Sequence, residues 1–196
     1  TAPGVNILAA VAAVEGDPVQ FDFYQGTSMA SPHGAGSAAL LVNLHPDWSP
    51  AAIKSAIALS ANQSVLDSDG ATPADPFDMG SGRIDLAKAA NIGFVLEETT
   101  ANYIAANPYS GGEPNTLNQP SMVEYTCIGT CTWTRTIQST LDAAQEWQIS
   151  FNVPSGIQLE ATPMNFTLAA GASQTIEITA DLSSGVVDTF YFADVI

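Results

Sequence analysis

Two patterns of hydrophobic and polar positions divide the chain near residue 98. Before this point, apolar residues recur every three or four positions, which is typical of one buried face of a helix. After it, apolar and polar residues alternate, and β-branched and aromatic residues replace alanine, which is typical of strands. We therefore predict an α/β part, residues 1–98, followed by an all-β part, residues 99–196.

Three helices are predicted in the first part. One lies between Ala30 and Pro46, because proline closes the helical pattern there. The second has the clearest start, since Ser49 is a good N-cap and Pro50, which lacks an N–H, suits the first helical position. A third fits residues 85–90, after a loop rich in Asp, Gly and Pro at residues 67–82.

Short strands are predicted in the second part, after a connector at residues 107–120 that is rich in Pro, Gly and Asn. Turn residues separate them at intervals of about 8–12 residues, which favours a small antiparallel sandwich. The clearest of these strands are predicted at residues 147–153, 157–159, 165–168 and 175–179.

The net charge of the chain excludes some classes of binding partner. The 196 residues include 20 acidic and 4 basic side chains, a net charge of −16. So few cations cannot neutralise the phosphates of a nucleic acid, and the negative field repels anionic lipids. No apolar run approaches the roughly 18–20 residues of a spanning helix. We expect no nucleic-acid partner and no membrane insertion.

Ser28 occupies a position suited to a nucleophile. It lies between a strand-like segment, residues 19–24, and the start of the first helix. Unpaired N–H groups and the positive end of the helix dipole favour an oxyanion there. For an isolated Gly-Thr-Ser sequence, a plain helix cap formed by Ser or Thr is the simpler alternative.

Residues 26–36, Gly-Thr-Ser-Met-Ala-Ser-Pro-His-Gly-Ala-Gly, resemble the serine motif of the subtilisin-like serine peptidases, the subtilases, at nearly every defining position. Residues 2–10 resemble the strand before that motif, and residues 73–85 are similar to the segment that closes the catalytic domain in multidomain members. The resemblance implies that residues 1–98 are the C-terminal part of a doubly wound parallel-sheet catalytic domain. It also implies a secreted endopeptidase that acts on polypeptides without a catalytic cofactor.

The resemblance assigns three site residues. Ser28 would be the nucleophile that forms an acyl-enzyme, and its N–H, near Thr27, would contribute to the oxyanion hole. Met29 would line the site as a neighbour sensitive to oxidation.

The triad Asp and His of the family, and its oxyanion Asn, precede the serine motif, and this chain contains none of these upstream motifs. His33 follows Ser28 by five positions, about 140° around a helix and roughly 7.5 Å along it, and His45 is still farther along. Neither ring is expected within the roughly 2.6–3.2 Å that a general base requires. We interpret both histidines as structural and expect the N-terminal part of the same protein to supply Asp and His. The chain alone is then expected to be inactive.

Residues 99–196 look like the fibronectin III-like sandwich that follows the catalytic domain in larger subtilases. Residues 117–123 and 133–137 resemble its first two strands. The chain begins without Met and ends in an apolar run, so both ends look cut and the sandwich is expected to be truncated. The alternative function is a pseudo-peptidase or binding protein that attaches to a polymer or cell surface through this sandwich.

Cys127 and Cys131 flank a three-residue loop that contains glycine. Across a hairpin they could form a disulfide, which would indicate an oxidising compartment. Free thiols are the alternative, and a zinc site is disfavoured because it needs four ligands and neither histidine is near.

Carboxylates alternate along Asp67-Ser68-Asp69-Gly70, with Asp75 and Asp78 following. Such a pattern suits calcium, but Asp78 stands where the twelve-residue calcium loop has glutamate. A solvated acidic loop is the favoured interpretation, and calcium is the alternative.

Overall fold

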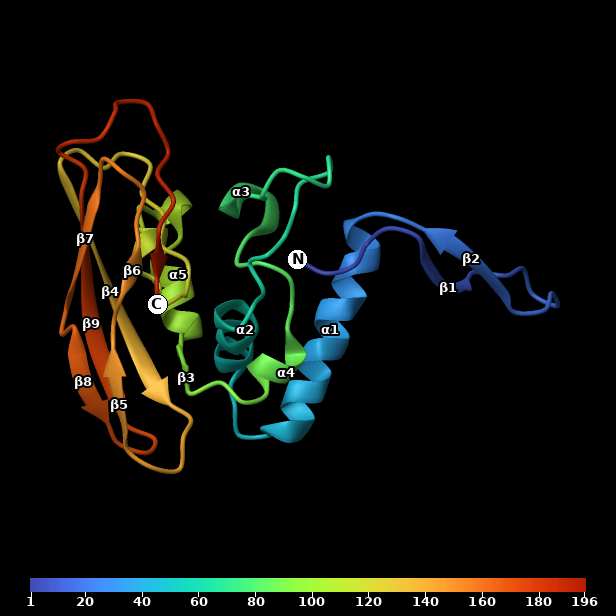
Figure 1. The fold of residues 1–196 in the computed structure, drawn as a ribbon. Coiled ribbons are helices and arrows are strands. Elements are labelled where there is room, and N and C mark those ends of the chain that lie inside the picture. The colour runs from blue at the N-terminus through green and yellow to red at the C-terminus, as the bar shows by residue number, and fades with distance from the viewer.

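The computed structural model describes residues 1–196 and places a helical part beside a β-rich part (Figure 1). The helical part contains β1 (Ile7–Val11), β2 (Gln20–Tyr24), α1 (Thr27–Leu44), α2 (Pro50–Leu59), α3 (Pro76–Met79) and α4 (Leu86–Ala89). The β-rich part contains β3 (Phe94–Val95), α5 (Thr100–Ala105), the 3₁₀ helices η1 (Pro108–Ser110) and η2 (Pro114–Thr116), β4 (Thr130–Ser139), β5 (Gln145–Gln148), β6 (Phe151–Asn152), β7 (Gln158–Thr162), β8 (Asn165–Leu168), β9 (Ser173–Asp181) and β10 (Asp194–Val195).

The three predicted helices are present. The boundary of α2 is confirmed, because the Ala52 N–H donates to Ser49 Oγ at 3.0 Å and Pro50 is the first helical residue. The first helix starts earlier than predicted, at Thr27. The short helices α3 and α5 were not predicted, since four and six residues are too few to establish a helical period.

The hairpin β1–β2 corrects the expected topology. Ile7 lies opposite Tyr24 in an antiparallel register, and every other strand pair in the structure is also antiparallel. Only eight residues connect β1 to β2, whereas a parallel pair needs a crossover of about a dozen or more. The expected parallel sheet is therefore not confirmed. The hairpin projects from the rest of the molecule (Figure 1), and all of β2 is exposed.

The β-rich part contains small antiparallel sheets, in line with the predicted strands, and their packing as a sandwich stays a prediction. A four-stranded sheet has the order β3-β4-β9-β7, and two smaller sheets pair β5 with β8 and β6 with β10. Strand β8 has the predicted bounds, whereas the strand predicted at 147–153 is divided into β5 and β6. Its fibronectin III-like identity stays a prediction.

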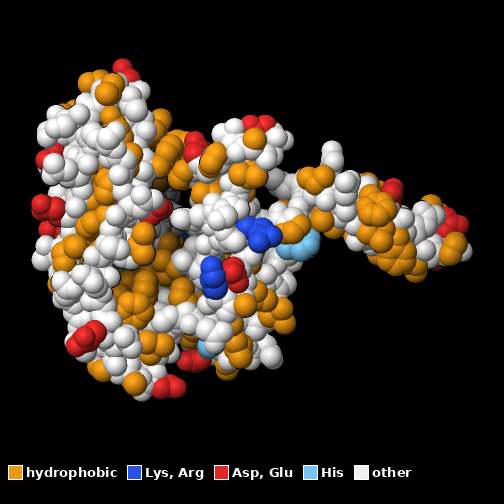
Figure 2. Space-filling model, viewed as in Figure 1, with side chains coloured by type: hydrophobic (Ala, Val, Ile, Leu, Met, Phe, Trp, Pro, Cys, Tyr) orange, Lys and Arg blue, Asp and Glu red, His pale blue; other side chains and the backbone are white.

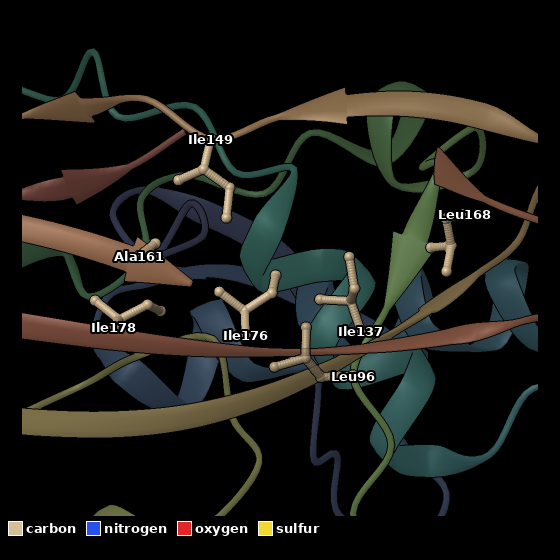
Figure 3. Close-up of a cluster of buried hydrophobic side chains, with 7 residues drawn as sticks. All are labelled: Leu96, Ile137, Ile149, Ala161, Leu168, Ile176 and Ile178. Carbon is tan, nitrogen blue, oxygen red and sulfur yellow. The ribbon is translucent and has the colours of Figure 1, made fainter. Parts of the chain in front are cut away.

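One cluster of buried side chains forms the core of this part (Figure 3). Strand β9 contributes two residues at alternate positions, as expected for a strand with one buried face, and β4 and β7 contribute one residue each. The other three residues lie outside the four-stranded sheet, so the core connects this sheet to the neighbouring segments. The seven residues are Leu96, Ile137, Ile149, Ala161, Leu168, Ile176 and Ile178.

Residues 117–123 form no strand, so that expectation is wrong. Side chains hold the segment instead of a backbone ladder. Arg135, which is buried, donates from Nε to the Gln119 carbonyl at 2.6 Å and from Nη2 to the Ser121 carbonyl at 3.1 Å. Pro120 between them has no N–H to give to a ladder.

The Cys127–Cys131 disulfide is confirmed, with the two Cα atoms 5.7 Å apart. Gly129 turns the loop at φ 81°, in the left-handed region that favours glycine. Its carbonyl accepts the Leu182 N–H at 2.7 Å, which holds the loop against the end of β9.

The helical and β-rich parts share a polar and an aromatic contact. Within the buried contact between α2 and the β3 segment, the Leu96 N–H donates to Ser55 Oγ at 2.9 Å. On α3, the Phe77 ring meets Phe190 and Phe192 edge to face, with centroids 5.0 and 5.2 Å apart. The boundary at residue 98 stays a prediction, and β3, just before it, already pairs with β4.

Candidate active site

Ser28 is the second residue of α1 and follows a tight turn at Gly26. Gly26 is the N-cap residue, and its φ of 135° is accessible to few residues other than glycine. No side chain caps this helix. The plain capping role weighed for Thr27 and Ser28 is therefore not the one they have.

The start of α1 is electrostatically positive. The first amide bonded to the Gly26 carbonyl is that of Met29, at 3.0 Å, so the Thr27 and Ser28 N–H groups precede the hydrogen bonds of the helix. No acidic side chain lies in the first turn to offset the helix dipole. A negative charge that develops beside Ser28 is stabilised in such a place.

The three predicted site residues lie together on this first turn. Thr27 and Ser28 are exposed, whereas Met29 is half-buried. Pro32, one turn later, lacks the N–H that would bond to the Ser28 carbonyl. The turn thus presents a serine hydroxyl and free amides on one accessible helix end.

Both histidines are engaged elsewhere. His33 Nδ1 lies 2.9 Å from the carbonyl oxygen of Met29 in its own helix. The His45 ring stacks on Trp48 with centroids 3.9 Å apart, and its Nε2 lies 2.9 Å from the Ala90 carbonyl oxygen. These contacts support the structural interpretation of both residues.

Sequence reasoning missed Gly4, which lies beside the serine turn. The Gly26 N–H donates to the Gly4 carbonyl at 2.7 Å, so the segment before β1 runs along the turn. A glycine that follows proline just before a strand is a signal for such a close backbone approach.

The elements around Ser28 expose much apolar surface. Of the 18 residues of α1, only Leu41 is buried, and Leu40 and Leu44 are more than half exposed. On β2, Phe21 and Phe23 are 64% and 62% exposed. Figure 2 shows hydrophobic side chains gathered along the projecting hairpin. Exposed apolar surface of this kind is typical of a site that contacts another protein surface.

In the acidic loop at residues 67–82, carboxylates accept hydrogen bonds from nearby residues of the same loop. Asp69 accepts hydrogen bonds from the Thr72 hydroxyl and from the Ala71 and Thr72 N–H groups. These bonds, that of the Thr72 hydroxyl foremost, lower the pKa of Asp69 to about 2. No group of three or more His, Cys, Asp or Glu side chains is arranged to hold a metal ion.

A polar cavity of about 390 Å³ lies on the β-rich part, and its lining includes residues 97–99, Asn118 and the β4 residues Thr134 and Thr136. Its polar groups are bonded to one another: Glu98 accepts from the Asn118 N–H at 2.6 Å and from the Asn102 amide at 2.6 Å. Burial alone would raise the pKa of Glu98, and the hydrogen bonds from Asn118, Thr99 and Asn102, with the charge of Arg135, lower it below its ordinary value. Hydrogen bonds among the lining residues therefore already satisfy the Glu98 carboxylate in this cavity.

The segment that contains the serine turn is similar to known proteins. Residues 1–82 match the Subtilase family. The chain is 42% identical to subtilisin-like protease SBT1.6 of Arabidopsis thaliana over 130 residues, which cover 59% of the chain and 17% of that protein. It is 34% identical to SBT3.10 (83% of the chain, 25% of that protein) and 32% identical to SBT1.7 (93% and 29%), both subtilisin-like proteases of the same plant.

All three of these relatives are subtilisin-like proteases. The chain spans less than a third of the length of each of these relatives. Likeness to SBT1.7 extends over 93% of the chain, and so into the β-rich part. None of the helices has the length and apolar character needed to cross a membrane.

Proposed function

We propose that the chain is part of a subtilisin-like serine endopeptidase that hydrolyses peptide bonds through an acyl-enzyme on Ser28. One observation carries the proposal: an exposed serine stands at the positive, uncapped start of α1, inside the segment that matches the subtilase family. The serine is free for chemistry because the helix does not use it as a cap.

In the proposed reaction, Ser28 Oγ attacks the carbonyl carbon of the scissile peptide while a histidine takes its proton. The carbonyl oxygen becomes an oxyanion, which the Ser28 N–H, near Thr27, stabilises at the positive helix end. The histidine then gives the proton to the leaving amine, and an acyl-serine ester remains. Water hydrolyses this ester by the same steps, and Met29 lines the site.

The catalytic histidine and aspartate would come from the N-terminal part of the same protein. Two observations support this arrangement: His33 and His45 bond to backbone carbonyls, and the apolar side chains of α1 and the hairpin lie uncovered. Residues 1–196 alone would then be inactive. Their first 98 residues would complete a catalytic domain, and residues 99–196 would form a fibronectin III-like support.

Secretion is part of the proposal. A disulfide between Cys127 and Cys131 persists in an oxidising compartment. The substrate would be a polypeptide met outside the cell.

Ser28→Ala tests the nucleophile in the full-length protein. We expect this variant to lose casein hydrolysis and labelling by a serine-directed fluorophosphonate. Ser31→Ala, which changes another exposed serine of α1, is the matched control and should retain both. Hydrolysis by Ser28→Ala at the rate of the unaltered protein would overturn the proposal.

An experiment on residues 1–196 alone tests whether the catalytic histidine and aspartate come from the N-terminal part of the protein. We expect no measurable labelling of Ser28 in this chain alone. Rapid labelling would show that the base lies within these residues and would overturn that part of the proposal.

A further inference from the structure

The backbone of Gly4 packs closely against the turn that carries Ser28. Besides accepting the Gly26 N–H at 2.7 Å, it leaves no room for a side chain. A Cβ at position 4 would lie 2.8 Å from the Gly26 carbonyl oxygen and 3.3 Å from Ala30 Cβ. The nearer atom belongs to the backbone, so rotating a side chain cannot relieve the contact.

The Gly26 carbonyl is the atom from which α1 begins. It accepts the Met29 N–H at 3.0 Å and the Ala30 N–H at 3.3 Å. Ser28 lies inside this first turn, so a displacement of the Gly26 carbonyl displaces the Ser28 hydroxyl and N–H with it.

The segment that contains Gly4 is itself held in place. The Thr1 carbonyl accepts the Ile84 N–H at 3.0 Å. Gly82, two residues before Ile84, is buried against Asn62, where a Cβ would lie 2.6 Å from the Asn62 carbonyl oxygen. With this support behind residues 1–4, the serine turn is the side that would yield.

We propose that Gly4 is a positioning residue for Ser28. Its missing side chain lets the Gly4 carbonyl accept the Gly26 N–H while the segment before β1 lies against the Gly26 carbonyl. The position of that carbonyl sets where the Ser28 Oγ and N–H stand. This inference rests on the proposed role of Ser28 as nucleophile. A misplacement of about 1 Å can cost about 100-fold in rate.

Gly4→Ala in the full-length protein tests the inference. We expect the apparent kcat on fluorescent casein to fall about 10–100-fold, a range in keeping with that sensitivity to position. The apparent KM should change less than threefold, and the rate of fluorophosphonate labelling should fall in the same proportion as kcat. A purely structural role would lower the unfolding temperature and leave these rates per folded molecule unchanged.

Two glycine variants serve as controls. Gly34→Ala lies on α1 where a Cβ meets nothing within 4 Å, and it should retain the original kcat. At Gly112, in the β-rich part, a Cβ would lie 2.1 Å from the Ala105 carbonyl oxygen. Gly112→Ala should therefore lower the unfolding temperature without lowering kcat per folded molecule. An equal loss of kcat in Gly4→Ala and Gly112→Ala would overturn the inference.

A second variant covers the case in which Gly4→Ala does not fold. Replacing Gly26 with glycolic acid turns its amide into an ester, so that an oxygen without a hydrogen stands where the N–H bonds to Gly4, and no side chain is added. We expect kcat to fall at least threefold, and an unchanged kcat would overturn the inference.

Ser28→Ala separates the two proposals. If Ser28→Ala is inactive while the position 4 and 26 variants keep full kcat, only the role of Gly4 fails; if Ser28→Ala is active, the proposed nucleophile fails.

Discussion

The Asn118 side chain completes the edge of β4 at Thr136. Its Oδ1 accepts the Thr136 N–H at 2.8 Å, and its Nδ2 donates to the Thr136 carbonyl at 2.8 Å, as a paired strand residue would. Strand β3 pairs only with Gln138 and Ser139. One carboxamide therefore covers the next pair of backbone groups on this edge.

Asn118→Leu should destabilise the β-rich part by about 2 kcal/mol, because it leaves the partly buried N–H and carbonyl of Thr136 without partners. Urea unfolding followed by tryptophan fluorescence measures the loss. Asn115→Leu, which removes a single contact to Glu124, is the control and should cost less than about 1 kcal/mol. Equal losses would contradict the role assigned to Asn118.

Replacing Arg135 with lysine should destabilise the β-rich part. Its guanidinium donates to four carbonyls, those of Asn115, Gln119, Ser121 and Thr134. Burial, offset in part by Glu98, lowers the pKa of Arg135 below its ordinary value. An ammonium cannot reproduce the planar fork, so Arg135→Lys should cost at least about 2 kcal/mol in urea unfolding. A lysine variant as stable as the original would contradict this.

The stability of the β-rich part should depend on pH through the Glu98 carboxylate. Its pKa is lowered in the folded state from 4.5. The resulting stabilisation is therefore complete above the unfolded value and is lost as the pH falls through the folded value. Glu98→Gln should flatten the fall in stability between about pH 5 and pH 3. Glu146→Gln, on exposed β5, is the control, and an identical pH profile in both variants would contradict the prediction.

Local signals account for what the sequence predicted correctly. Ser49 and Pro50 define the start of α2 through their own hydrogen-bonding capacity, and the serine motif places Ser28 at a strand-to-helix turn. Residues 117–123 were expected to form a strand because they resemble the first strand of the family's sandwich, and that likeness does not reveal that their partners come from the Arg135 and Asn118 side chains. Gly4 was missed for a similar reason, since its contact joins backbones 22 residues apart.

Phe77 should couple the helical and β-rich parts. It contacts Phe190 and Phe192 edge to face, and each such pair contributes about 0.5–1.5 kcal/mol. Phe77→Ala should therefore speed amide hydrogen exchange in residues 186–193. Phe21→Ala, on the hairpin, is the control and should leave exchange there unchanged. Exchange that is equally slow in both variants would show that Phe77 does not hold this segment.

Removing the Cys127–Cys131 disulfide should have a modest effect. The bond closes a loop of only five residues, so the entropy it removes from the unfolded chain corresponds to about 2 kcal/mol. The hydrogen bond from the Leu182 N–H to the Gly129 carbonyl holds the same loop independently of the sulfur atoms. We therefore expect the Cys127→Ser, Cys131→Ser double variant to fold, to lose no more than about 2 kcal/mol in urea unfolding, and to retain the hydrogen-exchange protection of β4 and β9. Loss of that protection would show that the disulfide is required for the β4–β9 pairing itself.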